Sequence, residues 1–424
     1  MEQSKQQKIH WWQVVRGNVL MLGLVSFFTD ASSEMIYPLL PIYFTGLVPA
    51  GTVAIYVGLM DGIAESVSSL LKIYSGRLSD ALGKRKSLAV AGYGISSISR
   101  PLMALAAVGW HVVFLRFCDR VGKGIRTSPR DALLSDSADP KARGLAFSFH
   151  RAMDHAGAVA GPLIAGVILY AMLGSTFWAG EKTTAGAEEM TALRWLFGLA
   201  LIPGVAAMIA LVGRVKEIAP TGHAVSNDPV KNSSPLSSTP LPRRFYLYLG
   251  TVTLFTLGNS SDLFLVFYAR EKFDLGLLFV LGLWVTLHLA KIIFSLPGGH
   301  FSDRYGRFRA IGIGWGFYVA VYFGMAQVTE QWMIWALLIV YGAYYGMTEG
   351  AEKALVADYV PSAQRGRAFG LYHGVVGLAA LPASLMFGVF WVELGPERAF
   401  TIGAALAFAA MALLVFLGSD QRKS

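Results

Sequence analysis

The chain has little charge. Only 15% of its 424 residues are Asp, Glu, Lys or Arg, whereas 54% are hydrophobic. Soluble domains carry about 25% charged residues, so this chain has too few polar side chains to cover a soluble fold of its size. It has one cysteine, Cys118, which excludes an internal disulfide and which we interpret as a packing residue. A lipid bilayer is the solvent that suits this composition.

Long apolar runs are abundant instead. A helix needs about 20 apolar residues to cross the hydrocarbon core of a bilayer. Six such runs precede residue 214 and six follow residue 244, centred near residues 30, 62, 98, 121, 160, 204, 256, 287, 320, 343, 380 and 409. The sequence therefore predicts an all-α integral membrane protein with 12 transmembrane helices.

Two segments of the chain occur twice. GRLSDALGKRK at residues 76–86 resembles GHFSDRYGRFR at 299–309, and ALLSD at 132–136 resembles ALVAD at 354–358. The offsets between matching aspartates, 303 minus 80 and 358 minus 136, are 223 and 222 residues. This constant spacing indicates two homologous halves, an arrangement typical of secondary transporters.

The repeat divides the chain into domains. We predict an N-terminal six-helix bundle at residues 1–213, a cytoplasmic linker at 214–243 and a C-terminal six-helix bundle at 244–424. The linker is predicted because residues 217–242 are rich in Ser, Pro, Thr and Asn and have no apolar periodicity. The two bundles should be pseudo-symmetric.

Lysine and arginine collect on one side of the predicted helices. They lie before the first helix and after the even-numbered ones, and include Lys5, Lys8, Arg16, Arg77, Lys84, Arg85, Lys86, Lys141, Arg143, Arg214, Lys216, Arg243, Arg244, Arg304, Arg307, Arg309, Arg365, Arg367, Arg422 and Lys423. By the positive-inside rule we expect both termini in the cytoplasm and a multi-pass protein of the inner, cytoplasmic membrane. This basic face accounts for the net charge of +9, so no nucleic-acid partner is expected.

The fourth predicted helix carries a stripe of charge. Its members fall within an arc of roughly 140° at 100° per residue, and they are Arg116, Asp119, Arg120, Lys123, Arg126, Arg130 and Asp131. Such a stripe cannot face lipid, so it lines a water-filled cavity or pairs with carboxylates on neighbouring helices. We expect Arg116, Arg120 and Arg126 to balance charge or to hold an anionic group of a substrate.

Carboxylates in the other helices of this half are proton-coupling candidates. They are Asp30, Glu34, Asp61, Glu65 and Asp154. One reading is that they neutralise the arginines and hold the bundle together. The other is that a moving helix changes their protonation, because burial favours the neutral carboxyl and a nearby arginine favours the ionised one.

In the second half, aromatic residues occupy positions that correspond to the charged stripe. With an offset of 222, Asp119 and Lys123 correspond to Tyr341 and Tyr345. These two tyrosines are candidates for contact with a substrate, the alternative being helix packing. Near the cytoplasmic end, Glu352 and Lys353 are expected to pair with each other.

The fifth predicted helix contains small residues and a proline. Gly157 and Gly161 are four residues apart, a spacing that lets helix backbones approach closely, and Pro162 loosens the helix one turn away. We expect either tight packing or a bending point at the interface between the halves.

These features resemble the major facilitator superfamily of secondary transporters over nearly the whole chain. The repeated loop is similar to the signature Gly-x-Leu-x-Asp-x-x-Gly-Arg/Lys-Arg/Lys of that family. The resemblance implies a gating role for its residues in both halves, namely Gly76, Asp80, Gly83, Lys84, Arg85, Asp303, Arg304, Gly306 and Arg307.

In that family the aspartate of the loop is implied to cap a neighbouring helix and to pair with an arginine, which stabilises the outward-facing state. Ala81 departs from the usual basic residue of the signature, whereas Arg304 keeps it in the second copy. In the first half, the contact is then expected to be weaker or to use Arg77 instead.

Three further patterns refine the resemblance. Arg120 and Gly124 look like a helix-four pattern associated with proton transfer, and the helix-five glycines look like an antiporter pattern in which Ala165 replaces one glycine. The runs at 28–38 and 122–132 resemble a little-characterised prokaryotic branch whose substrate we do not know.

The function that follows is transport by alternating access. The first hypothesis is proton-coupled export, by antiport, of an amphipathic or anionic small molecule such as a drug or siderophore; the alternative is proton-coupled uptake of an organic anion or nutrient. A membrane sensor or enzyme is a remote alternative, since no nucleotide-binding glycine loop and no metal-ligand spacing is present. We expect no metal and no cofactor, with the proton gradient as driving force, and a functional monomer in the bilayer.

Overall fold

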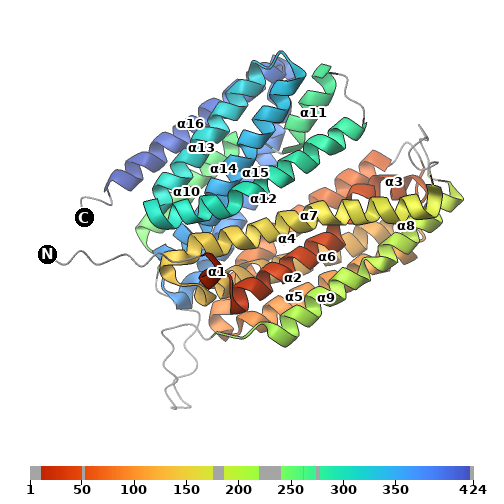
Figure 1. Cartoon of the computed structure of the whole chain (residues 1–424), viewed down its shortest axis with the longest axis horizontal. Helices are drawn as coiled ribbons and strands as arrows, with labels where there is room; N and C mark the ends of the chain where they lie inside the picture. The colour runs from red at the N-terminus through yellow and green to blue at the C-terminus, as the bar shows by residue number, and fades with distance from the viewer. Residues whose placement is uncertain are drawn as a thin grey trace.

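The computed structural model of the chain describes residues 11–49, 53–174, 186–218, 240–260, 262–273 and 277–420. All regular secondary structure in these ranges is helical (Figure 1). A helix satisfies its own backbone N–H and C=O groups, which is why apolar runs adopt it in lipid. The greater part of the predicted linker, residues 219–239, lies outside the described residues.

The described part of the N-terminal half forms α-helices α1 to α9. They are α1 (Trp11–Val14), α2 (Gly17–Glu34), α3 (Leu40–Thr45), α4 (Val53–Leu82), α5 (Arg85–Leu102), α6 (Gly109–Ser137), α7 (Arg143–Leu173), α8 (Ala187–Leu199) and α9 (Leu201–Arg214). Short 3₁₀ turns join some of them, and the turn between α2 and α3 contains Pro38. Proline lacks a backbone N–H, so the first span is interrupted there.

The described part of the C-terminal half forms α10 to α16. They are α10 (Arg243–Gly258), α11 (Asp262–Phe273), α12 (Leu277–Tyr305), α13 (Arg307–Ala326), α14 (Gln331–Tyr359), α15 (Arg365–Leu394) and α16 (Pro396–Asp420). The seventh predicted span is interrupted between α10 and α11, where Asn259 and Ser260 are not helical.

These helices cover all the centres predicted from the apolar runs, with α2 and α3, α8 and α9, and α10 and α11 each sharing one span. Within the described ranges, 6 helical stretches are long and apolar enough to cross a membrane by length and composition alone. α6 is not one of them, because charged residues interrupt its apolar run. Its place in the membrane depends on the helices that surround it.

The two bundles lie side by side, with α1 and the C-terminal end of α16 at the same end of the molecule (Figure 1). We call this end the termini side. α4 packs against α15, and α7 packs against α12 and α14. Gly76 on α4 lies so close to α15 that a Cβ atom added there would be 2.1 Å from the backbone oxygen of Gly366. The contact between the bundles therefore requires glycine at this crossing.

The small residues of α7 pack closely against α2. A Cβ atom at Gly157 would lie 2.4 Å from the backbone oxygen of Phe27, and one at Gly161 would lie 2.7 Å from that of Ala31, both on α2. Of the two expectations for these glycines, tight packing is confirmed, because they pack α7 against α2 within one bundle and do not lie at the interface between the halves. α7 is also continuous through Pro162.

Candidate functional site

A polar cavity of about 200 Å³ lies among the helices of the N-terminal bundle and reaches α15 of the other bundle. Its lining side chains come from six helices and are Ser26, Thr29, Asp30, Lys72, Tyr93, Lys123, Arg126, Thr127, Arg130, Arg151, Asp154 and His373. Pockets for drug-sized ligands measure roughly 300–1,000 Å³, so this arrangement suits a smaller molecule.

Cations outnumber anions among the described residues that line this cavity. Lys72, Lys123, Arg126, Arg130 and Arg151 face it, against the carboxylates Asp30 and Asp154. Helix α6 supplies three of these cations, so part of the predicted stripe does line a cavity. The electrostatic potential of such a site attracts an anionic group.

The partners of the cavity residues fix their positions. The Arg126 guanidinium lies 4.4 Å from the ring centroid of Tyr93, which holds it by a cation–π contact. Arg151 donates to Asp154 at 2.7 Å, and Ser26 also donates to Asp154. Asp154 is thus an ion-pair partner as well as a lining residue.

The other two arginines of the stripe, Arg116 and Arg120, have different partners. Arg116 and Arg120 lie 3.1 Å and 3.9 Å from Asp119, which also accepts a hydrogen bond from Arg100 on α5 at 3.0 Å. Neither Arg116 nor Arg120 lines the cavity. Their arrangement is that of charge balance around a buried carboxylate.

One further carboxylate candidate lies beyond the cavity, and two have no described side chain. Glu34 is half-buried on α2, beside Gly161, and is not a lining residue. The side chains of Asp61 and Glu65, on α4, lie outside the described residues. Asp30 and Asp154 are therefore the proton-coupling candidates that the structure brings to the cavity.

A contact between the bundles lies next to the cavity. Asp131, fully buried on α6, pairs with Arg130 at 2.8 Å and with two residues of the other bundle, Lys353 at 3.3 Å and His373 at 2.7 Å. The expected pairing of Glu352 with Lys353 is wrong, because Lys353 points to Asp131. His373 is not among the residues that the sequence predicted for the site, although a single histidine in an apolar span is a signal of function.

The two candidate tyrosines meet at one carboxylate in the C-terminal bundle. Tyr341 and Tyr345 donate to the same oxygen of Asp262, at 2.9 Å and 2.8 Å, and Lys291 donates to the other oxygen at 2.8 Å. Asp262 is the first residue of α11, directly after the interruption of the seventh span. The tyrosine hydroxyls thus hold the broken helix, which favours the packing alternative.

The signature loop of the first half caps a helix of the second half. Asp80 accepts hydrogen bonds from the backbone N–H groups of Gly366 at 2.9 Å and Arg367 at 2.6 Å, in the first turn of α15. A carboxylate is favourable there because the first N–H groups of a helix have no intrahelical partner. The cap that the family resemblance implies is present.

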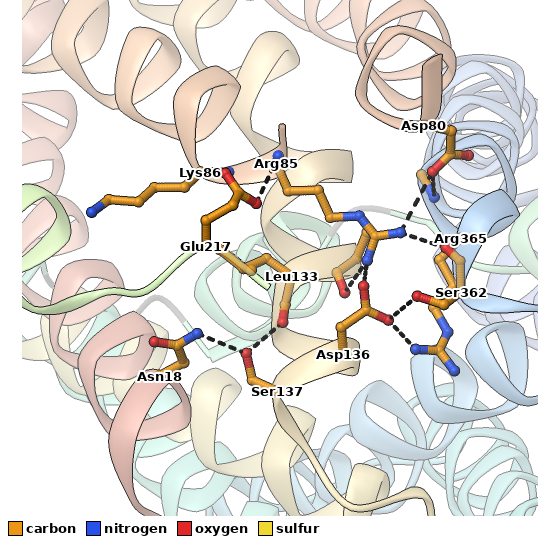
Figure 2. Close-up of polar contacts among 12 residues, drawn as sticks. Asn18, Asp80, Arg85, Lys86, Leu133, Asp136, Ser137, Glu217, Ser362 and Arg365 are labelled. Carbon is orange, nitrogen blue, oxygen red and sulfur yellow. Dashed lines mark hydrogen bonds and ion pairs between the residues drawn. The ribbon is translucent and has the colours of Figure 1, made fainter. Parts of the chain in front are cut away.

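Next to this cap, one carboxylate joins two arginines across the interface (Figure 2). Asp136 of α6 forms ion pairs with Arg85 of α5 and Arg365 of α15, and accepts a hydrogen bond from Ser362 at 2.8 Å. Arg85 is completely buried and lies 3.6 Å from Asp80. Asp136 is therefore the centre of the contact, although the repeat had marked it only as a matching position.

The signature loop of the second half in turn caps a helix of the first half. Asp303 accepts hydrogen bonds from the backbone N–H groups of Gly144 at 3.0 Å and Leu145 at 2.8 Å, in the first turn of α7. Arg307 contacts Asp303 and lies 3.3 Å from Asp358, which pairs with Arg143 at 2.7 Å. The repeat in the sequence is thus a repeat of contacts.

The basic partners of the two aspartates differ from those expected. Arg77 is exposed, and the burial of Arg85 makes it, not Arg77, the partner of Asp80. Arg304 is exposed beside Tyr305, and Arg307 takes the role at Asp303.

The remaining members of the gating set shape the turns. Lys84 is exposed. Gly83 and Gly306 have φ angles of +61° and +100°, which L-residues with a side chain rarely adopt, so they allow the tight turns before α5 and α13.

Replacing Asp80 with alanine is expected to weaken the cap on α15. Loss of a helix cap costs about 0.5–2 kcal/mol. Because this cap joins the two bundles, its loss weakens the contact between them by that amount. The distance between spin labels at exposed positions on the termini side of the two bundles should increase, with Asp139→Ala as control, because Asp139 caps only Lys141 in its own loop at 2.8 Å. An unchanged distance in Asp80→Ala would refute the gating role of Asp80.

Two helical bundles with a repeated set of contacts and a charged cavity define a membrane transport protein. The chain belongs to the Major Facilitator Superfamily, whose family model matches residues 22–288 and 276–424. The predicted family, and the predicted fold of 12 helices in two bundles, are thereby confirmed. Proteins of this family are transporters and not enzymes.

Individual relatives agree with this assignment. An uncharacterized MFS-type transporter of Methanocaldococcus jannaschii is 32% identical over 94% of both chains. A class E tetracycline resistance protein of Escherichia coli is 24% identical, again over 94% of both. The crystal structure of the human organic anion transporter MFSD10 superposes with a TM-score of 0.75 at 15% identity, covering 94% of this chain and 98% of that one, which shows a shared fold.

Proposed function

We propose that this transporter exports a small anionic or amphipathic molecule in exchange for protons. The observation that carries the proposal is the excess of cations in the cavity, five against two carboxylates among the described lining residues. An anionic group of the substrate would lie against Arg126 and its neighbours. The cavity volume favours a compact organic anion over a bulky drug or siderophore.

The direction of transport and its coupling to protons are supported by separate observations. Export is favoured by the similarity to a relative that is a multi-drug resistance efflux pump homolog, and coupling by the carboxylates Asp30 and Asp154 beside the cations. We place both termini in the cytoplasm, on the inner membrane, from the distribution of lysine and arginine. Uptake of an organic anion with protons is the second candidate, because the same charged cavity serves either direction.

Alternating access assigns a role to the contacts on the termini side. The caps by Asp80 and Asp303 and the ion pairs around Asp136 and Asp358 would close this side of the cavity in one state and separate in the other. The driving force would be the proton gradient, without a bound cofactor, and one chain would suffice.

The proposal is tested in sealed vesicles that contain the purified protein and a pH-sensitive dye. An inward acid gradient is imposed, and pools of organic acids, dyes, drugs and siderophores are screened for compound-dependent proton flux. Movement of compound and proton in opposite directions would support export, and movement in the same direction would support uptake. Absence of flux with every pool would contradict proton coupling.

Asp30→Asn is expected to reduce this proton flux by at least about tenfold. The amide cannot take up a proton, and a side chain that transfers protons contributes a factor of this size or more to a rate. Downhill exchange of the compound should persist. Glu393→Gln, at an exposed carboxylate near the end of α15, is the control. Full gradient-driven transport by Asp30→Asn would show that Asp30 has no coupling role.

A further inference from the structure

One carboxylate of the C-terminal bundle differs from its neighbours in its partners. Glu352 on α14 accepts a hydrogen bond from the indole N–H of Trp315 on α13 at 3.1 Å and one from the hydroxyl of Tyr372 on α15 at 2.6 Å. No nitrogen of Lys, Arg or His in the described residues lies within 4.0 Å of it. Both partners are neutral.

Five other carboxylates in the membrane-embedded part have a basic partner. A nitrogen of Arg, Lys or His lies within 4.0 Å of Asp119, Asp131, Asp154, Asp262 and Glu349. An ionised carboxylate is costly away from water unless a cation or several donors compensate it. Glu352 lacks the cation, so its environment favours the neutral carboxyl more than theirs does.

The hydrogen bonds suit a protonated side chain. When Oε2 takes up a proton, it donates to the hydroxyl oxygen of Tyr372, and the Tyr372 O–H no longer donates to Glu352, while Oε1 still accepts from Trp315. Both carboxyl oxygens thus remain hydrogen-bonded to the same two side chains.

The groups around Glu352 connect it with the cavity. His373, which follows Tyr372 with ring centroids 5.2 Å apart, lines the cavity and contacts Asp131 of the other bundle. The titratable and charged groups that act on Glu352 are Tyr372 on α15, Tyr344, Glu349 and Lys353 on its own helix, and Tyr248 on α10. Trp315 is the polar contact from α13.

Movement of the bundles changes this environment. Lys353, the residue after Glu352, is neutralised by Asp131 across the interface. If the bundles separate on the termini side, Lys353 leaves Asp131, which keeps Arg130 on its own helix. The charge of Lys353 then acts on the carboxylates of α14 and favours their ionised form.

We propose that Glu352 is a proton-binding site of the transport cycle, protonated in the present arrangement and ionised when Lys353 separates from Asp131. This inference rests on the proposed proton coupling, but it places a coupling carboxyl in the C-terminal bundle, outside the cavity.

Infrared spectroscopy of the purified full-length protein in lipid tests this without a substrate. Near neutral pH, the wild type should show the C=O absorption of a protonated carboxylic acid. Glu352→Gln should lose this absorption while remaining folded, because the amide accepts from Trp315 and donates to Tyr372 as the protonated acid does. Tyr372→Phe should keep the absorption but shift its frequency, and the exposed Glu393→Gln should leave it unchanged.

An absorption that is the same in Glu352→Gln and wild type, or unshifted in Tyr372→Phe, would overturn the assignment. Asp131→Asn should reduce the absorption, since it leaves the charge of Lys353 unbalanced, and an unchanged amplitude would overturn the release step. If the wild type has no compound-dependent proton flux while these spectra behave as expected, the proposed coupling fails and the protonation of Glu352 stands. The two failures are thus distinguishable.

Discussion

Asp136→Ala is expected to open the termini side of the molecule. Asp136 pairs with Arg85 and Arg365, and its side chain is only 4% exposed (Figure 2). Removing one partner of a buried ion pair costs about 3–5 kcal/mol, because the remaining charge is left without compensation. Arg85 keeps Asp80 at 3.6 Å, so we expect the lower end of this range. About 3 kcal/mol corresponds to a shift of roughly a hundredfold in the population of the closed arrangement.

The repeat in the chain supplies the matched control. Asp358 occupies the corresponding position and pairs with Arg143 and Arg307, but its side chain is 35% exposed. Pairs in contact with water are worth about 0–1 kcal/mol, so Asp358→Ala should have a much smaller effect.

Distances between spin labels measure the two effects. Labels on Leu82→Cys and Arg309→Cys, in a Cys118→Ser background, report on exposed positions at the termini side of the two bundles. The distance should increase in Asp136→Ala and remain nearly unchanged in Asp358→Ala. Equal changes in both variants would show that burial of the ion pair does not control closure.

Gly76→Ala is expected to have the second large effect, also on closure. A Cβ atom there would lie 2.1 Å from the backbone oxygen of Gly366 on the other bundle. Overpacking of this kind costs about 1–3 kcal/mol, and separation of the bundles relieves it. The closed population should fall by about 5–150-fold, with little change in the thermal stability of each bundle.

Gly298→Ala provides the comparison. Its Cβ atom would lie at the same 2.1 Å from a backbone oxygen, that of Gly346, but both residues belong to the C-terminal bundle. No movement between bundles relieves this clash, so the melting temperature should fall by several degrees while the distance between spin labels stays constant. A lower melting temperature in Gly76→Ala, without a change in distance, would contradict the separation of these two roles.

The candidate site was only partly predictable. The width of the charged stripe on α6 showed that it cannot face lipid, but one helix meets several neighbours along its length. Arg126 and Arg130 reach the cavity, whereas Arg116 and Arg120 meet Asp119, which Arg100 of α5 also contacts. Periodicity gives the face of a helix and does not give what the neighbouring helix places opposite it.

Residues that are adjacent in sequence have different partners for the same reason. Glu352 and Lys353 differ by about 100° around the helix axis, so they face different elements. Lys353 crosses to Asp131 of the other half, and Glu352 meets Trp315 and Tyr372 within its own half. Likewise Gly157 and Gly161 share a face, but only packing revealed that this face lies against α2.

The sequence by itself determined the helical membrane fold, its division into two related halves and the two aspartates that cap a neighbouring helix. These depend on the length of apolar runs and on a short repeated motif, which are local properties of the chain. The tertiary structure alone decided which charges face the cavity, which pair across the interface and which carboxylate lies among neutral donors. Those properties depend on distances between side chains that are remote in sequence, because electrostatic and hydrogen-bond energies change within a few ångströms.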